Sequence, residues 1–147
     1  MKLKQISVSI ENSPGRLLEV TQALADAGIN LRALSLVDTG DFGQLRLLVS
    51  DVHNARRIMM EKHLPARVDE VVAVEIEDKP GSFARLLKPL LSKQVNVNYT
   101  YAFAGFSVDK VVMIFRFSDN DQAIEILQKN GIKPLSAEAF GILDAKA

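Results

Sequence analysis

The sequence predicts an α+β protein in which one β-α-β-β-α-β unit occurs twice. The first observation is an internal repeat: residues 10–17 (IENSPGRL) return as residues 76–83 (IEDKPGSF), and the triplet 29–31 (INL) returns as 95–97 (VNV) with the same shift. Seven of the 24 positions from 8 to 31 are identical in the second copy. The second observation is that strand-like and helix-like apolar spacings follow one another in the same order in both copies. Together they indicate a duplicated structural unit.

The composition excludes several classes of protein. The 147 residues divide into two repeats of about 70, each small for an independent core, so we expect the repeats to depend on each other or on a second chain. Eighteen basic residues balance eighteen acidic ones, so no overall field favours a nucleic-acid partner. Cysteine is absent, which excludes disulfides and thiolate chemistry. No apolar run approaches the roughly 18 residues of a membrane span, so we expect a cytoplasmic protein without a membrane partner.

The first repeat begins with a strand and a helix. Residues 4–11 alternate, with Ile6, Val8 and Ile10 on one side and Gln5, Ser7 and Ser9 on the other, which predicts a half-buried strand. Asn12-Ser13-Pro14-Gly15 then predicts a turn and a helix start, in which Asn or Ser caps free amides and Pro14 takes the first helical position. Apolar residues at helical spacing continue from Leu17 to Ala25, and Gly28 is a plausible stop.

The rest of the first repeat predicts a hairpin, a helix and a closing strand. Residues 31–37 and 44–49 form the two strands of the hairpin. Ser50-Asp51 can cap a helix with Ala55, Ile58 and Met59 facing inward, and this helix ends near Leu64-Pro65. A short strand at 67–70 closes the unit. The order is β-α-β-β-α-β, the ferredoxin-like arrangement of an antiparallel four-stranded sheet with two helices on one face.

The second repeat predicts the same elements in the same order. They are a strand at 71–77, a helix at 80–92, hairpin strands at 97–103 and 110–117, a helix at 119–129 and a closing strand at 132–137. We therefore expect two domains, 1–70 and 71–147. The repeats have diverged, because Pro89 falls inside the second helix, where we expect it to break a backbone bond and kink the helix. Eight of the nine aromatic residues lie in the second repeat.

A turn of the form [Asn/Asp]-x-Pro-Gly-x-[Leu/Phe], followed by an Ile/Val-Asn-apolar triplet, resembles the ACT domain. The resemblance covers both repeats and implies a stand-alone tandem ACT protein, from a family of small regulatory modules that bind amino acids. In that family the ligand lodges between the first turn and the second strand, commonly at an interface between two domains. The positions implied as ligand-binding are Asn12, Ser13, Gly15, Arg16, Asn30 and Leu31 in the first repeat, and Asp78, Gly81, Asn96 and Val97 in the second.

The residue types at these positions agree with that implication. A helix N-terminus offers free N–H groups and a positive dipole end to a carboxylate. Asn12 and Asn30 carry both a donor and an acceptor, whereas an ionised Asp78 accepts only and repels a carboxylate. We therefore expect the better amino-acid site in the first repeat. The alternative is that Asn12 and Asp78 are helix caps and that Asn30 and Asn96 are turn residues, as these residue types often are.

The favoured function is a non-catalytic regulatory protein that binds a free amino acid. The alternative is an interaction module, with or without a ligand, that docks onto an amino-acid biosynthetic enzyme as its regulatory subunit. We expect no catalytic residues, no cofactor and no metal, since no cofactor fingerprint or nucleophile motif is present and His53 and His63 lack a third ligand. The resemblance also implies sheets joined edge to edge, and hence a homodimer.

Overall fold

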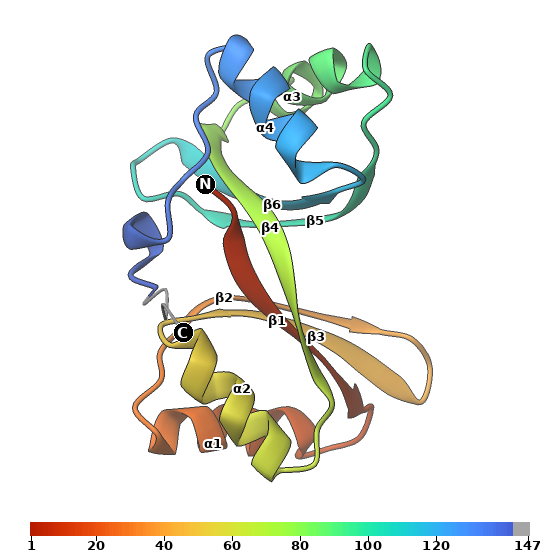
Figure 1. Cartoon of the computed structure of the whole chain (residues 1–147), viewed down its shortest axis with the longest axis vertical. Helices are drawn as coiled ribbons and strands as arrows, with labels where there is room; N and C mark the ends of the chain where they lie inside the picture. Colours follow the sequence, from red (N-terminus) through yellow and green to blue (C-terminus); the bar gives the residue numbers. More distant parts are fainter. Residues whose placement is uncertain (143–147) are drawn as a thin grey trace. The chain divides into compact units, whose positions relative to one another are not determined.

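The computed structural model describes residues 1–142, and the chain folds into two compact units (Figure 1). We call residues 4–69 and 137–142 the first unit, and residues 1–3 and 70–136 the second unit. Residues 1–3 and residues 137–142 therefore each belong to the unit that is built mainly from the other repeat. The last five residues of the predicted second domain lie outside the described residues.

The first unit contains β2, β3, all of β1 except its first residue, the beginning of a fourth strand and two helices. The sheet order is β2-β3-β1-β4, and β3 pairs antiparallel with both β1 and β2. The two helices pack on each other and lie on one face of the sheet (Figure 1). The elements are β1 (Leu3–Glu11), α1 (Arg16–Asp26), β2 (Leu31–Asp38), β3 (Phe42–Val49), α2 (Val52–Glu61), the start of β4 (Ala66–Glu77) and a 3-10 turn, η1 (Glu138–Phe140).

The second unit repeats this arrangement with the order β4-β6-β5, again antiparallel and with both helices on one face (Figure 1). The elements are the rest of β4, α3 (Ser82–Leu91), β5 (Val97–Ala104), β6 (Lys110–Phe117) and α4 (Asn120–Lys129). The predicted α+β fold of two ferredoxin-like units is confirmed. The predicted helix cap at Asp51 is also confirmed, because its carboxylate accepts from the Asn54 amide at 3.1 Å, and Asp119 caps α4 in the same way.

The strand that joins the two repeats differs from the prediction. We expected two strands, at 67–70 and 71–77, but β4 runs without interruption from Ala66 to Glu77. The segment contains no Gly or Pro, and Val71, Val72, Ala73 and Val74 are fully buried. A continuous run of mostly β-branched residues without a breaker favours one long strand. One strand therefore closes the first sheet and opens the second.

The closing strand predicted at 132–137 is wrong. The structure has only an isolated bridge between Val74 and Pro134, next to a bond from the Leu135 amide to the Ala73 carbonyl at 2.7 Å. Pro134 has no N–H to donate to a ladder, so pairing cannot extend through it. In the second unit the segment after α4 therefore runs beside β4 but pairs with it only around Pro134, so the fourth strand is incomplete.

The core of each unit lies between its helices and its sheet. In the second unit, Phe115 is fully buried and stacks on Phe117 at 4.8 Å and on Phe83 at 6.0 Å between ring centroids. On α3, Leu86 and Leu90 are buried, but Leu91 is 76 % exposed. The helix continues past Pro89 for two residues, and its last turn places Leu91 in solvent.

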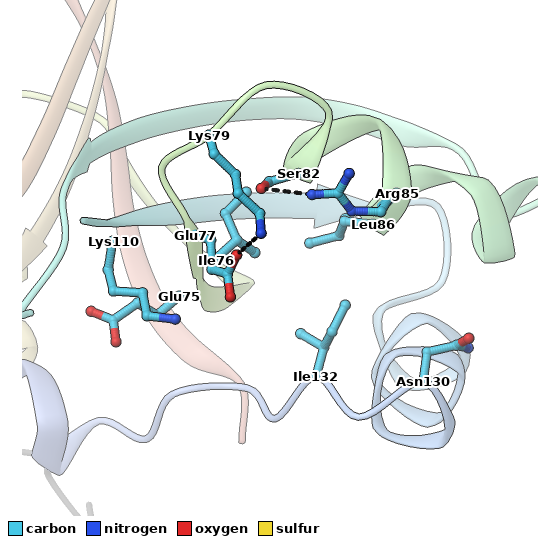
Figure 2. Close-up of a pocket in the computed structure, with 10 residues that line it drawn as sticks. All are labelled: Glu75, Ile76, Glu77, Lys79, Ser82, Arg85, Leu86, Lys110, Asn130 and Ile132. Carbon is cyan, nitrogen blue, oxygen red and sulfur yellow. Dashed lines mark hydrogen bonds and ion pairs between the residues drawn. The ribbon is translucent and has the colours of Figure 1, made fainter.

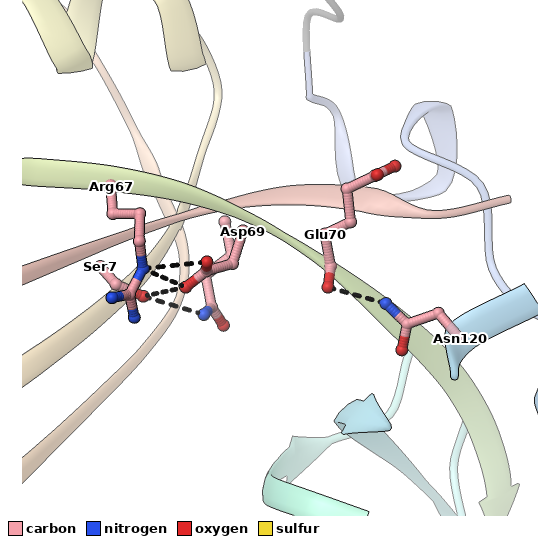
Figure 3. A network of polar contacts seen from close by, with 6 residues as sticks. Ser7, Arg67, Asp69, Glu70 and Asn120 are labelled. Carbon is pink, nitrogen blue, oxygen red and sulfur yellow. Dashed lines mark hydrogen bonds and ion pairs between the residues drawn. The ribbon is translucent and has the colours of Figure 1, made fainter. Parts of the chain in front are cut away.

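The polar side of β1 is more buried than the alternation predicted. Gln5 and Ser7 are almost completely inaccessible, whereas Ser9 is exposed as expected. The Ser7 hydroxyl donates to Oδ2 of Asp69 at 3.1 Å, and Arg67 Nε donates to Oδ1 of the same carboxylate at 3.0 Å (Figure 3). The Gln5 amide donates to the Ser7 oxygen at 3.3 Å. These bonds satisfy the buried carboxylate and tie β4 to β1 within the first unit.

Candidate ligand sites at the repeated turns

The two Pro-Gly turns have the same backbone geometry, and a positive φ explains their glycines. Gly15 (φ 89°) and Gly81 (φ 87°) are the N-cap residues of α1 and α3, in the left-handed region that favours glycine. The helices therefore begin at Arg16 and Ser82, so the prediction that Pro14 takes the first helical position is wrong. A Cβ at Gly15 would meet no atom within 4 Å, so its backbone conformation is what requires glycine.

Asn12 is not a helix cap, because neither α1 nor α3 has a side-chain cap. Its backbone amide donates to the Asp41 carbonyl at 2.8 Å, and its side-chain amide donates to the Gly40 carbonyl at 2.9 Å. In the second unit the Asp78 amide makes the same backbone bond, to the carbonyl of Asp109. The predicted alternative of a cap is thus wrong, and Asn12 joins the turn to the hairpin loop.

Asn30 and Asn96 come directly before the second strand of each unit, and backbone hydrogen bonds hold them in place. The Asn30 amide donates to the Ser50 hydroxyl at 2.8 Å, while the Ser50 amide donates to the Asn30 carbonyl at 2.9 Å. Asn96 exchanges the same two bonds with Ser118, both at 2.9 Å. The Asn96 side chain also donates to the side-chain oxygen of Asn98. Both asparagines are exposed and lie directly before a strand, outside the turns that follow α1 and α3.

Within one unit the structure does not bring the two halves of the predicted site together. Asn12 follows the pair Glu11–Phe42 at the start of β3, whereas Asn30 and Leu31 lie beside Val49 and Ser50 at its end. The eight residues of β3 separate these ends by roughly 25 Å at the usual strand rise. The same separation holds between Asp78 and Gly81 on one side and Asn96 and Val97 on the other, because the register is repeated.

A small cavity lies beside the first turn and contains two of the predicted residues, Asn12 and Ser13. Its volume is about 190 Å³, and its other lining residues are Ile10, Glu11, Leu17, Leu36, Asp38 and Gly43. The missing side chain of Gly43 makes room for Leu36, since a Cβ there would lie 2.9 Å from Cδ1 of Leu36. Sequence reasoning missed the residues from the hairpin strands. Strand pairing was the available signal, because the end of β2 and the start of β3 must meet the end of β1.

A second cavity, of about 410 Å³, lies on another side of the first turn and includes Arg16. Arg16 forms an ion pair with Glu19 at 2.9 Å, so its guanidinium is already neutralised within α1. None of the predicted residues of the second unit lines the corresponding cavity of that unit.

The repeated βαββαβ architecture and its two glycine-capped turns define a tandem regulatory module of the ACT type. Residues 1–141 match the ACT domain pair family, and the chain belongs to that family. ACT domains are regulatory modules. A search of curated proteins found no significant match.

Solved structures share the fold over most of the chain. Protein BT0572 from Bacteroides thetaiotaomicron is 35 % identical with a TM-score of 0.90, covering 97 % of this chain and 98 % of that one. The regulatory subunit of aspartate kinase from Thermus thermophilus, in a ligand-free form, is 18 % identical with a TM-score of 0.61, covering 86 % and 90 %. The corresponding subunit from Thermus flavus is 19 % identical with a TM-score of 0.63, covering 85 % and 88 %. At these identities the two kinase subunits show a shared fold. None of the helices within residues 1–142 is long and apolar enough to cross a membrane.

Proposed function

We propose that this chain is a cytoplasmic, non-catalytic regulatory protein that binds a free amino acid at its first turn. The observation that carries the proposal is the cavity of about 190 Å³ at Asn12, which combines acceptors with an apolar wall. Pockets for drug-sized ligands occupy about 300–1,000 Å³. This smaller cavity suits a molecule of amino-acid size.

The chemistry of the lining fits the two ends of an amino acid. The Asn12 side chain uses its N–H on Gly40, which leaves its oxygen as an acceptor facing an ammonium group. The Asp38 carboxylate, on the same cavity, attracts that ammonium. The N-terminal turn of α1 lies beside the cavity and favours the carboxylate. Ile10, Leu17 and Leu36 provide the apolar contact for a short side chain.

A second copy of the chain would complete the site. Asn30 and Leu31 lie at the far end of the sheet, so a ligand that contacts both halves cannot take them from one first unit, and a second molecule would supply the other half. The edge strand β2 supports this assembly, because Leu34 and Leu36 are 46 % and 43 % exposed, and Leu18 on α1 is 65 % exposed. Unpaired edge strands with exposed apolar residues invite pairing.

The second unit is less suited to this role. The positions equivalent to Leu18, Leu34 and Leu36 carry the smaller or more polar residues Ala84, Thr100 and Ala102. The side chain of Asp78, which stands in place of Asn12, cannot donate to the hairpin loop, and its carboxylate repels a ligand carboxylate. The proposal is therefore specific: a homodimer formed through the β2 edges, with amino-acid sites at the two first turns.

A thermal-shift screen of the full chain against the free amino acids tests the proposal. Saturation at a hundredfold excess over the dissociation constant adds about 2.7 kcal/mol to the free energy of unfolding, which raises Tm by roughly 5–11 °C for a protein of this size. Asn12→Ala is expected to remove the shift, and Asp78→Ala is the matched control that keeps it. If no amino acid shifts Tm at millimolar concentration, the proposal fails in favour of a docking module for a biosynthetic enzyme.

A further inference from the structure

The second unit contains a larger cavity that has no role in the amino-acid site. It has a volume of about 540 Å³ and lies among the end of β4, the first turn of α3 and the segment that follows α4 (Figure 2). Its apolar side is formed by Ile76, Leu86 and Ile132. The incomplete fourth strand leaves this side of the sheet open. The residues of the cavity at Asn12 are not part of it, because they belong to the first unit.

The cavity is a duplicated feature whose charges have diverged. The cavity of about 410 Å³ in the first unit occupies the equivalent place, and its Ile10, Val20 and Leu64 correspond to the apolar residues of the second. The helix positions differ. Arg16 and Glu19 form an ion pair in the first unit, whereas the same positions in the second unit are Ser82 and Arg85. The change removes a carboxylate and leaves a guanidinium.

The carboxylates that line the larger cavity already have partners. Glu77 pairs with Lys79, and Glu75 accepts a hydrogen bond from the Phe106 amide at 2.8 Å. Arg85 and Lys110 form no ion pair within residues 1–142. The cavity therefore has two cations without an ion-pair partner, one on α3 and one at the start of β6, on either side of Glu77 (Figure 2). Both attract the Glu77 carboxylate only through longer-range electrostatics, because its direct partner is Lys79.

The position of the Arg85 guanidinium is fixed by two neighbours. Its Nη2 donates to the Ser82 hydroxyl at 3.2 Å. A Cβ at Gly81 would lie 3.0 Å from its Nη1, so the glycine leaves the space that the guanidinium occupies above the turn. The remaining N–H groups of the guanidinium form a planar fork that matches a carboxylate or a phosphate. The N-terminal end of α3, directly below, favours the same negative charge.

We propose that this cavity is a second ligand site, which binds a small anionic molecule through Arg85 and Lys110. A carboxylate or phosphate group contacts the two cations on the cavity side of the Glu77–Lys79 pair, and the rest of the molecule packs on Ile76, Leu86 and Ile132. This site goes beyond the amino-acid site, because it uses other residues, lies in the other unit and does not require an ammonium group. The family's regulatory role then extends to two chemically different signals on one chain.

Titration calorimetry on the full chain, at constant ionic strength, tests the second site. The probes are succinate for a carboxylate source, inorganic phosphate for a phosphate source, and succinamide as the neutral analogue. Binding of succinate or phosphate, without binding of succinamide, is the expected result, and the tighter of the two anions identifies the source. If neither anion binds at millimolar concentration, the proposal is overturned.

Substitutions then locate the site. Arg85→Gln is expected to weaken anion binding about tenfold or more, because it removes a charge-assisted pair of hydrogen bonds. Arg85→Lys keeps the charge without the fork and gives an intermediate loss. Lys88→Gln, on the same helix but outside the cavity, is the matched control and binds as the unmodified chain does. Equal affinity in Arg85→Gln and Lys88→Gln would place the anion elsewhere and overturn the assignment, while the amino-acid screen at the first turn stays unaffected by either result.

Discussion

Asn12 and Gly40 are joined by a hydrogen bond of 2.9 Å from the side-chain amide of the first to the carbonyl of the second. The bond links the glycine-capped turn to the β2–β3 hairpin loop, although 28 residues separate the two in the sequence. It also orients the asparagine, because one N–H is used on the loop and the oxygen is left for the cavity. Asp78 has no side-chain N–H in the equivalent place, so the two turns share a backbone but differ in chemistry.

Gly15→Ala tests whether backbone conformation alone requires the glycine. We expect a loss of about 1–2 kcal/mol in the free energy of unfolding, because a residue with a Cβ is strained at φ 89°. No atom lies close enough to clash, so strain is the whole effect. Gly15→Asn is the matched variant and should lose less, since asparagine tolerates this region. Urea denaturation measures both values, and a loss in Gly15→Asn equal to that in Gly15→Ala would contradict this explanation.

Ser7→Ala tests the buried polar contact between β1 and β4. The substitution removes one hydrogen bond from the Asp69 carboxylate, and we expect a loss of about 1–3 kcal/mol because the charge is buried. Ser9→Ala, two residues along on the exposed part of the same strand, is the control and should change little. Chemical denaturation of both variants compares them directly. Similar stability of the two variants would show that the contact contributes nothing.

The pKa of Glu77 gives a prediction about pH. A hydrogen bond from Lys79, and then the nearby positive charges, lower the pKa of the Glu77 carboxyl below its ordinary value. Because the folded pKa is the lower one, this interaction stabilises the fold above the ordinary glutamate pKa, and the effect is lost as pH falls through the folded pKa. Lys79→Ala should move the pKa back upward. Carboxyl-carbon NMR titration measures it, and an unchanged pKa in the variant would contradict the assigned cause.

The assembly through β2 can be tested by charge. Leu34→Lys and Leu36→Lys place cations on the edge strand, where two copies would meet in a symmetric interface. We expect the unmodified chain to be a dimer in light scattering after size exclusion, and the double variant to be a monomer. Thr100→Lys with Ala102→Lys changes the equivalent edge of the second unit and should leave the dimer intact. A monomeric unmodified chain, or dissociation by the second pair only, would rule out this interface.

Much of the fold could be predicted from the spacing of apolar residues, which repeats with the period of a strand or of a helix. The starts of α1 and α3 come from the Pro-Gly turns, and Asp51 and Asp119 mark the starts of α2 and α4 because their carboxylates bond free amides. The absence of a closing strand at 132–137 was not predicted, because the apolar residues there suit a strand although Pro134 prevents a continuous ladder. Similarly, Gln5 and Ser7 are buried by tertiary packing, which the alternation of polar and apolar residues in β1 cannot predict.

The candidate site was less predictable than the fold. The turn residues Asn12 and Ser13 do line a cavity, and the repeat located them. Leu36, Asp38 and Gly43 join them only because β2 and β3 are paired in a definite register. The separation of Asn12 and Asn30 could not be read from the sequence either. Both residues belong to the same repeated motif, but strand pairing places them beside opposite ends of β3.

Calorimetric titration of the amino acids into the full chain, Asn12→Ala and Asp78→Ala tests the central claim most directly. The account predicts that at least one small amino acid binds the unmodified chain, that Asn12→Ala loses most of this affinity, and that Asp78→Ala retains it. Equal losses in the two variants, or no binding to the unmodified chain, would contradict an amino-acid site at the first turn.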